Sequence, residues 1–236
     1  MNKLQGKIAV VTGASTGIGA TIAKELAMEG AHIVLVARRL DKLNKVKSEI
    51  TELTNNKGNV MAVQTDISDK NDVYQLAKKV QAELGNVDIF VNNAGQMLAG
   101  TVRSGKVEEW EAMVDVNIKG VLYGIDAVLP SMLSRSTGHL INVASVSGLE
   151  VTKTSTVYSA TKHAVRAISM GLEKELARTG VRMTNISPGM VDTDLSSNNT
   201  WNDRKMLETK DIAKAVVYAV TQPDYVNVNE VTVRPV

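Results

Sequence analysis

The chain has 236 residues, of which 44% are hydrophobic, and this is enough for one domain with a substantial core or at most two small ones. Its 27 basic residues nearly balance 25 acidic ones, which gives no electrostatic reason to expect nucleic acid as a partner. The absence of cysteine excludes a disulfide framework, and no apolar run approaches the roughly 18 residues that span a bilayer. We therefore expect a cytoplasmic protein with no membrane segment.

Short apolar runs alternate with longer helical patterns along the whole chain. The runs predicted as buried strands are Ile8–Thr12, His32–Ala37, Val60–Gln64, Val87–Val91, His139–Val143, Val181–Ile186 and Glu230–Val233. The helices predicted between them are a stretch ending near Met28, then Asp41–Leu53, Asp69–Leu84, Val107–Leu133, Val157–Arg178 and Asp211–Val220. This alternation indicates a doubly wound, seven-stranded parallel sheet with helices on both faces, in a single domain over residues 1–236.

A glycine-rich turn joins the first strand to the first helix. It reads Thr12-Gly13-Ala14-Ser15-Thr16-Gly17-Ile18-Gly19, with the spacing G-x-x-x-G-x-G. Glycines let the backbone approach a pyrophosphate closely, while a helix N-terminus presents free N–H groups and a partial positive charge. An ordinary strand-to-helix turn is the alternative, but the position after the first strand favours a phosphate cradle.

The second strand ends in Arg38 and Arg39, without the acidic residue that receives the adenine-ribose 2′-hydroxyl in NAD-binding sheets. A carboxylate would repel the 2′-phosphate of NADP, whereas a guanidinium can bind it through two hydrogen bonds. A solvated helix start is the plainer explanation of these arginines. We nevertheless expect NADP(H) as the cofactor.

Tyr158 and Lys162 stand four residues apart at the start of a predicted helix, so both side chains share one face. The pKa of free tyrosine, about 10, is too high for a general base at neutral pH. An ammonium about 5 Å away stabilises a phenolate by roughly 3 kcal/mol at an effective dielectric near 20, so Lys162 can lower the pKa of Tyr158. Taken alone, such a pair also arises by chance on exposed helices.

Other polar residues stand where parallel strands deliver ligands, at the carboxyl ends. Ser145 follows the fifth strand, and Asn92-Asn93-Ala94-Gly95 ends the fourth. The Ser145 hydroxyl can share a substrate oxygen with Tyr158 as an oxyanion donor, or make only a local turn bond. Asn117 lies within a predicted helix, where asparagine is unfavourable and a surface position is the default.

Together these motifs resemble the short-chain dehydrogenase/reductase family, in its single-domain branch. The resemblance extends from the first strand to the last and also includes Pro188-Gly189 with Thr193. It implies a Rossmann-type three-layer α/β/α fold. It also implies hydride transfer, without a metal, between the nicotinamide of NADP(H) and a small carbonyl or alcohol substrate.

The resemblance implies a catalytic tetrad. Tyr158 would exchange the proton, Ser145 would hold the substrate oxygen, and Lys162 would bind the nicotinamide ribose and tune Tyr158. Asn117 would position a water that links Lys162 to solvent. The three histidines match none of these roles, and we interpret them as structural.

The family pattern also implies a set of cofactor contacts. They are Gly13, Ser15, Thr16, Gly17, Ile18, Gly19, Arg38, Arg39, Asp66, Ile67, Asn93, Ala94, Gly95, Tyr158, Lys162, Pro188, Gly189, Val191 and Thr193. The polar stretch at 196–203 lies within a predicted substrate loop or lid that spans about 190–207.

The C-terminal stretch 222–235 is similar to NADP-dependent 3-hydroxy-acid and serine dehydrogenases and to related aldehyde reductases. A 3-hydroxy acid, an aldehyde or a ketone is therefore an expected substrate. Members of the family are commonly tetramers paired through the helices that here are 107–133 and 157–178. By analogy we expect a homotetramer or homodimer.

Two other functions are compatible with parts of the pattern. A sugar-nucleotide epimerase or dehydratase shares the fold and the Tyr/Lys pair, but usually has a larger substrate domain than the residues after Gly189 provide. A non-catalytic NADP-binding or redox-sensing protein would need the cradle, but not Asn117, Ser145, Tyr158 and Lys162 together.

Overall fold

The computed structural model describes residues 2–193 and 205–236. Within these ranges seven strands form one fully parallel sheet in the order β3-β2-β1-β4-β5-β6-β7. Their bounds are β1 Ile8–Thr12, β2 His32–Ala37, β3 Val60–Gln64, β4 Ile89–Asn92, β5 Gly138–Val143, β6 Val181–Pro188 and β7 Glu230–Val233. The predicted doubly wound sheet is confirmed, and strand order reverses between β1 and β4, where such sheets bind ligands.

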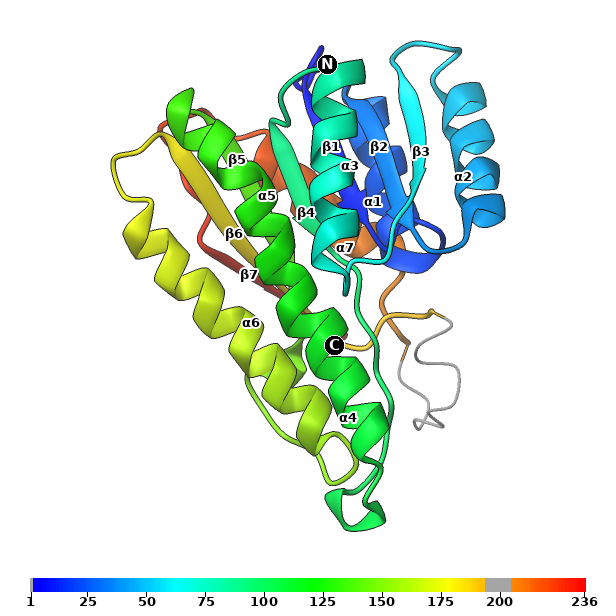
Figure 1. The fold of residues 1–236 in the computed structure, drawn as a ribbon, viewed down its shortest axis with the longest axis vertical. Helices are drawn as coiled ribbons and strands as arrows, with labels where there is room; N and C mark the ends of the chain where they lie inside the picture. The colour runs from blue at the N-terminus through cyan, green and yellow to red at the C-terminus, as the bar shows by residue number, and fades with distance from the viewer. Residues whose placement is uncertain (1, 194–204) are drawn as a thin grey trace.

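Helices cover both faces of the sheet, as Figure 1 shows. One face carries α1 Gly17–Met28, α2 Leu40–Leu53 and α7 Thr209–Val220. The other carries α3 Lys70–Glu83, α5 Gly120–Ser134 and α6 Thr156–Glu175. No described helix is long and apolar enough to cross a membrane.

The two apolar layers follow from the period of a β-strand. In β1, Ala9 and Val11 pack into the layer under α1, while Ile8 and Val10 pack into the layer under α3 and α5. Successive side chains of a strand point to opposite faces, so a strand that is apolar at every position needs a helix on each side. Burial of each such side chain contributes about 1.5–3 kcal/mol.

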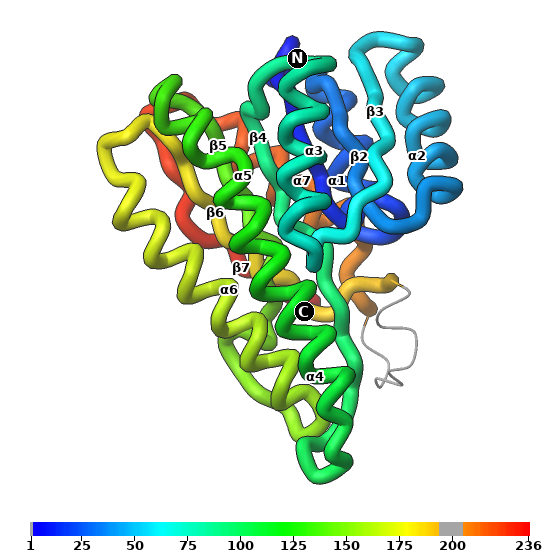
Figure 2. The backbone as a smooth tube through the Cα atoms, in the orientation of Figure 1, coloured from blue at the N-terminus to red at the C-terminus, as the bar shows by residue number. Residues whose placement is uncertain are grey.

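The predicted helix 107–133 is one continuous rod made of three parts. It consists of α4 Val107–Val114, a π-helical turn η2 at Asp115–Lys119, and α5. Figure 2 shows α4 continuing directly into α5. Asn117 lies in η2 with 1% of its surface exposed, so the default surface position is wrong for it. π-turns of this kind occur frequently at functional sites.

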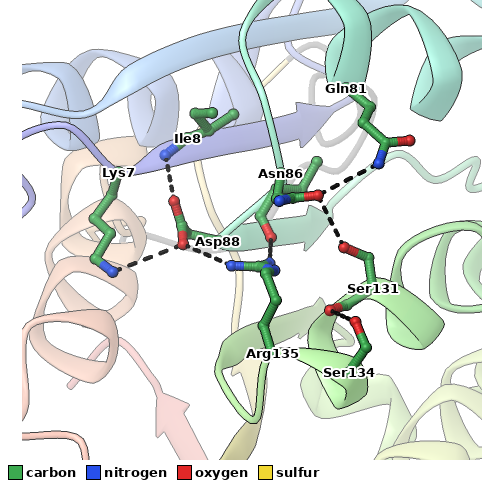
Figure 3. A network of polar contacts seen from close by, with 9 residues as sticks. Lys7, Ile8, Gln81, Asn86, Asp88, Ser131, Ser134 and Arg135 are labelled. Atoms are coloured by element: carbon green, nitrogen blue, oxygen red, sulfur yellow. Dashed lines mark hydrogen bonds and ion pairs between the residues drawn. The ribbon is translucent and has the colours of Figure 1, made fainter.

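A polar network joins the elements at the amino-terminal edge of the sheet (Figure 3). The Asp88 carboxylate accepts a hydrogen bond from the Ile8 backbone N–H at 3.0 Å and pairs with Arg135 at 3.4 Å and Lys7 at 3.7 Å. Arg135 also donates to the Val87 carbonyl at 2.6 Å. The end of α5 is thereby tied to β1 and to the entry of β4.

Most of the predicted lid, residues 194–204, lies outside the described residues. Its two flanks are described and lie together. Val191 forms a parallel β-bridge with Leu207, the Asp192 N–H donates to the Leu207 carbonyl at 2.8 Å, and the Leu207 N–H donates to the Met190 carbonyl at 2.9 Å. The two flanks of the predicted lid therefore meet beyond β6.

Candidate active site

The glycine turn after β1 is packed too closely for side chains. Gly13 has a φ of +66°, and a Cβ on Gly19 would lie 2.4 Å from the Gly13 carbonyl oxygen and 2.5 Å from Asn93 Nδ2. Thr16 is the N-cap of α1, and its side chain makes no capping bond. The backbone N–H groups of the first turn therefore have no side-chain acceptor from the N-cap, which is what an anion site at a helix N-terminus requires.

Thr12 fastens this turn to the end of β4. Its hydroxyl donates to the Val91 carbonyl at 3.1 Å and accepts the N–H groups of Asn93 and Ala94, each at 3.0 Å. The Asn93 amide donates in turn to the Thr12 carbonyl at 2.9 Å. Thr12 was part of the predicted motif, but no role was predicted for it. Its hydroxyl at the end of an otherwise apolar strand could have indicated one.

The two arginines after β2 make different contacts. Arg39 donates to the Ser15 hydroxyl of the glycine turn at 3.1 Å. Burial tends to raise the pKa of Asp66, but hydrogen bonds from Ser68 and the charge of Arg38 outweigh it, and the pKa is lowered. Both guanidinium groups therefore lie along the edge where β2 and β3 end, and both are exposed.

Ser145 and Tyr158 meet beyond the end of β5. Ser145 begins the short 3₁₀-helix η3, Val146–Gly148, and its hydroxyl accepts the Ser147 N–H at 3.1 Å. The Tyr158 hydroxyl lies close enough to this side chain for Ser145 to affect its pKa. Burial raises the pKa of Tyr158, and the interaction with Ser145 opposes this rise. The direction differs from the expected lowering because burial outweighs the neighbouring groups.

Lys162 is buried beside Tyr158 on α6. Its ammonium lies 5.8 Å from the centre of the Tyr158 ring and donates to the Val143 carbonyl at 2.9 Å. Burial lowers the pKa of Lys162 to about 8. A Cβ on Gly95 would lie 3.6 Å from the ammonium and 3.3 Å from Asn117 Oδ1, so the end of β4 lies against both side chains.

The Asn117 side chain joins three segments. Its Oδ1 accepts the Gln96 N–H at 2.8 Å, and its Nδ2 donates to the Gln96 carbonyl at 2.9 Å and to the Thr161 hydroxyl at 3.0 Å. Neither Gln96 nor Thr161 was predicted to belong to the site. Gln96 could not be predicted from its residue type, because only its backbone N–H and carbonyl bind Asn117. Thr161 was detectable as a hydroxyl between Tyr158 and Lys162.

The residues after β6 lie beside the cradle. The Gly189 N–H donates to the Val233 carbonyl at 2.7 Å, which holds Pro188 and Gly189 against β7. A Cβ on Gly17 would lie 3.5 Å from the Thr193 methyl carbon.

Ile67, a predicted adenine contact, packs against Gly120 of α5. A Cβ added to Gly120 would lie 2.4 Å from Ile67 Cδ1.

Within the described part of the chain, the hydrogen bonds of the three histidines join them to groups outside the candidate site. His139 is buried and hydrogen-bonded to the Thr184 hydroxyl at 2.8 Å, and burial lowers its pKa to about 3, so it is neutral. His32 and His163 each make a local hydrogen bond to the backbone. These contacts agree with the structural interpretation.

Comparisons with known proteins show the family of the chain. The protein-family model for short chain dehydrogenases matches residues 7–204. An uncharacterized oxidoreductase of Staphylococcus saprophyticus is 56% identical over 236 residues, which is 100% of each chain. A closed form of serine dehydrogenase complexed with NADP+ has a TM-score of 0.89 at 33% identity, over 97% of this chain and 94% of its own.

A further structure, an alcohol dehydrogenase from the archaeon Thermococcus sibiricus complexed with 5-hydroxy-NADP, has a TM-score of 0.89 at 32% identity. The match covers 98% of this chain and 97% of the archaeal one. Fold, length and sequence thus agree along nearly the whole molecule. The chain is an oxidoreductase and belongs to the short-chain dehydrogenase/reductase family.

Proposed function

We propose that the protein is an NADP(H)-dependent reductase or dehydrogenase of small carbonyl or alcohol substrates, with Tyr158 as the acid/base. The observation that carries the proposal is the meeting of Ser145, Tyr158 and Lys162 beside Gly95, at the sheet edge that also holds the glycine cradle. Binding of a dinucleotide alone would not require a tyrosine hydroxyl, a serine hydroxyl and a buried ammonium gathered at one place.

The residues present fit a dinucleotide. Gly13 and Gly19 let the turn pack closely on itself and on the end of β4, and the first turn of α1 offers N–H groups to a pyrophosphate. Arg38 and Arg39 would bind the 2′-phosphate, and Asp66 with Ile67 would lie near the adenine. Lys162 would bind the nicotinamide ribose. The segment from Pro188 to Thr193 would cover the nicotinamide.

The chain's own groups would handle the oxygen and the proton. When bound, NADPH supplies a hydride to the carbonyl carbon, and NADP+ accepts one in the reverse direction. The substrate oxygen accepts hydrogen bonds from Ser145 and Tyr158. As the C–O bond gains alkoxide character, the Tyr158 O–H bond breaks and the alcohol O–H bond forms. The Lys162 ammonium stabilises the phenolate that is left.

The NADP complexes among the structural relatives support the choice of cofactor. Two of these relatives are a serine dehydrogenase and an alcohol dehydrogenase, which supports a hydroxyl group as the site of oxidation. We therefore include 3-hydroxy acids, aldehydes and ketones in the substrate class. Residues 190–207 are proposed as the substrate lid.

Assembly as a homotetramer or homodimer is part of the same proposal. The exposed surfaces of α5 and α6 carry Leu122, Leu133 and Met170, which are apolar side chains of the kind that a second copy would cover. The molar mass in solution, measured by light scattering, tests it.

Exchange of Tyr158 for phenylalanine tests the acid/base role. We expect a screen of hydroxy acids, aldehydes, diketones and ketones with NADP+ or NADPH to find turnover by the wild type. Tyr158→Phe should then lose at least about a hundredfold in kcat, which is the usual contribution of a general acid. Quenching of the protein's tryptophan fluorescence by NADPH should still show that the variant binds the cofactor.

Two outcomes would contradict the proposal in different ways. Turnover by Tyr158→Phe at the wild-type rate would remove Tyr158 from the chemistry. Tight NADPH binding by a wild type that turns over no compound of the screen would favour the non-catalytic alternative.

A further inference from the structure

A buried hydroxyl connects the two helices of the candidate active site. Thr161 lies on α6 between Tyr158 and Lys162, with 1% of its surface exposed. Its Oγ1 donates to the Tyr158 carbonyl at 2.7 Å and accepts a hydrogen bond from Asn117 Nδ2 at 3.0 Å. A hydroxyl has one proton to donate, so the two bonds define its orientation.

The contacts of Asn117 show why this connection matters. Both N–H bonds of its amide are used, one on Gln96 and one on Thr161, and its oxygen accepts the Gln96 N–H. Both N–H groups of the Asn117 side chain therefore bind other parts of the protein, the Gln96 backbone and Thr161. The only side-chain partner among these contacts is Thr161, so it is the point at which the π-turn η2 holds α6.

A helical threonine commonly bonds a carbonyl in the preceding turn, and such a bond alone would carry no functional meaning. Ser169 on the same helix donates to the Val165 carbonyl at 2.8 Å and accepts a hydrogen bond from Asn142 Nδ2 of β5 at 2.9 Å. Thr161 differs because the carbonyl it bonds belongs to Tyr158 itself, and because the side chain it accepts from, Asn117, also holds the Gln96 backbone. Loss of the hydroxyl would leave a buried amide N–H without an acceptor, which is costly enough to displace one of the partners.

We propose that Thr161 is a positioning residue of the reaction, whose hydroxyl holds the first turn of α6 on Asn117 and so sets Tyr158 against Ser145. The inference rests on the proposed function for its kinetic part. Thr161 touches neither substrate nor cofactor in this scheme. It acts through the placement of the tyrosine, and small displacements at a reacting centre have large kinetic effects.

The test compares Thr161→Val, which keeps the shape and removes the hydroxyl, with Thr161→Ser, which keeps the hydroxyl. We expect Thr161→Val to lose about tenfold to a hundredfold in kcat with the KM for substrate and the Kd for NADPH within about twofold of wild type. Thr161→Ser should restore at least about half of the wild-type kcat. Thr161→Ala provides a second hydroxyl-free variant if the valine does not fold.

Thr184→Val is the matched control, because Thr184 is also buried and hydrogen-bonded, but to His139 within the sheet. It should lower the melting temperature and leave kcat unchanged.

A second measurement needs no turnover. The ionisation of Tyr158 can be followed by ¹³C NMR of the protein with labelled tyrosine, and Tyr158→Phe identifies its signal among those of the five tyrosines. Thr161→Val should move that midpoint to higher pH, because Tyr158 would lie farther from Ser145, whose interaction lowers its pKa.

The outcomes separate the two proposals. A lower melting temperature for Thr161→Val with an unchanged kcat and an unchanged Tyr158 midpoint would overturn the positioning role and leave the proposed function intact. A wild type without turnover would overturn the proposed function, and the tyrosine titration would then decide the positioning role alone.

Discussion

At the end of β2, two adjacent arginines contact different parts of the molecule. Arg39 is hydrogen-bonded to Ser15 in the glycine turn, whereas Arg38 acts on the Asp66 carboxyl through its charge. An additional anionic phosphate would be drawn to both guanidinium groups. Arg39 has to share its donors with Ser15, so Arg38 is the better probe of cofactor preference.

We expect NADPH to bind more tightly than NADH, by about tenfold to several hundredfold, because each charge-assisted hydrogen bond contributes roughly 1.5–3 kcal/mol. Arg38→Ala should narrow this difference, as measured by fluorescence titration with both cofactors. Lys47→Ala removes a charge from the exposed surface of α2 and should leave the ratio unchanged. Equal affinities of the wild type for the two cofactors would rule out the NADP assignment.

The proposed role of Lys162 in the reaction conflicts with its effect on stability. Burial lowers its pKa to about 8 from 10.5, so between these values the unfolded chain binds more protons than the native one. Stability therefore rises with pH across this window, and the full cost of burying the ammonium is present below about pH 8.

Lys162→Met should therefore make the ligand-free protein more stable at pH 7, by about 1–3 kcal/mol, while abolishing turnover. The gain should shrink as the pH approaches 10, since the wild-type lysine is then neutral in the native state. Urea unfolding at both pH values measures it, with the exposed Lys174→Met as the control. A gain that is equal at the two pH values would show that the ammonium is not the cause.

At the scale of elements, the close approach of α1 to the glycine turn depends on a missing side chain. Gly19→Ala would place a Cβ 2.4 Å from a backbone oxygen, so α1 would have to move away from β1. We expect a loss of NADPH affinity of at least about tenfold, together with about 1–3 kcal/mol of stability. Fluorescence titration and thermal melting measure the two effects.

Gly171→Ala is the matched control. Gly171 lies in α6, and a Cβ there would meet no atom within 4 Å. Alanine should stabilise this helix by up to about 1 kcal/mol and leave NADPH binding unchanged. If both variants lost affinity equally, the close packing of the cradle would not be the reason.

The elements also show what the sequence could reveal. Strand positions followed from local composition, and the range Glu230–Val233 was confirmed without change. Ends set by long-range partners were missed: β6 continues to Pro188 because it pairs with Val233 of β7. Helix α7 begins at Thr209, earlier than predicted, because Glu208 and Asp211 form a reciprocal capping box.

In the candidate site, sequence reasoning found residues whose chemical type is unusual in their context. Tyr158 and Lys162 could be named from their four-residue spacing at the start of a predicted helix, and Ser145 from its place after a predicted strand. The π-turn around Asn117 could not, since its partner is the backbone of Gln96, which any residue type supplies. Tertiary hydrogen bonds of this kind leave no trace in periodicity or composition.

At the scale of the whole molecule, the two edges of the sheet hold different groups. The carboxyl edge holds the candidate chemistry, while the amino edge is held by the network around Asp88. Because the two edges are a strand length apart, damage to the Asp88 network should lower stability without altering the reacting groups.

We expect Asp88→Ala to lower the free energy of unfolding by about 1–3 kcal/mol, since the Ile8 N–H and Arg135 lose their acceptor. Urea titration measures this, and kcat per folded molecule should be unchanged. Glu83→Ala, which removes an exposed ion pair with Lys79, should cost less than about 0.5 kcal/mol. A fall in kcat for Asp88→Ala would show that the two edges are coupled.

The bridge between Val191 and Leu207 has a consequence for how substrate range can change over evolution. A loop whose two ends are already joined can be lengthened at small entropic cost, about 0.6 kcal/mol for each doubling. Under the proposal that residues 190–207 form the substrate lid, the residues between these flanks can be exchanged while the sheet and the groups proposed to transfer the proton keep their places. Transplanting this segment from a homologue of different substrate range is then the way to change the substrate of the enzyme.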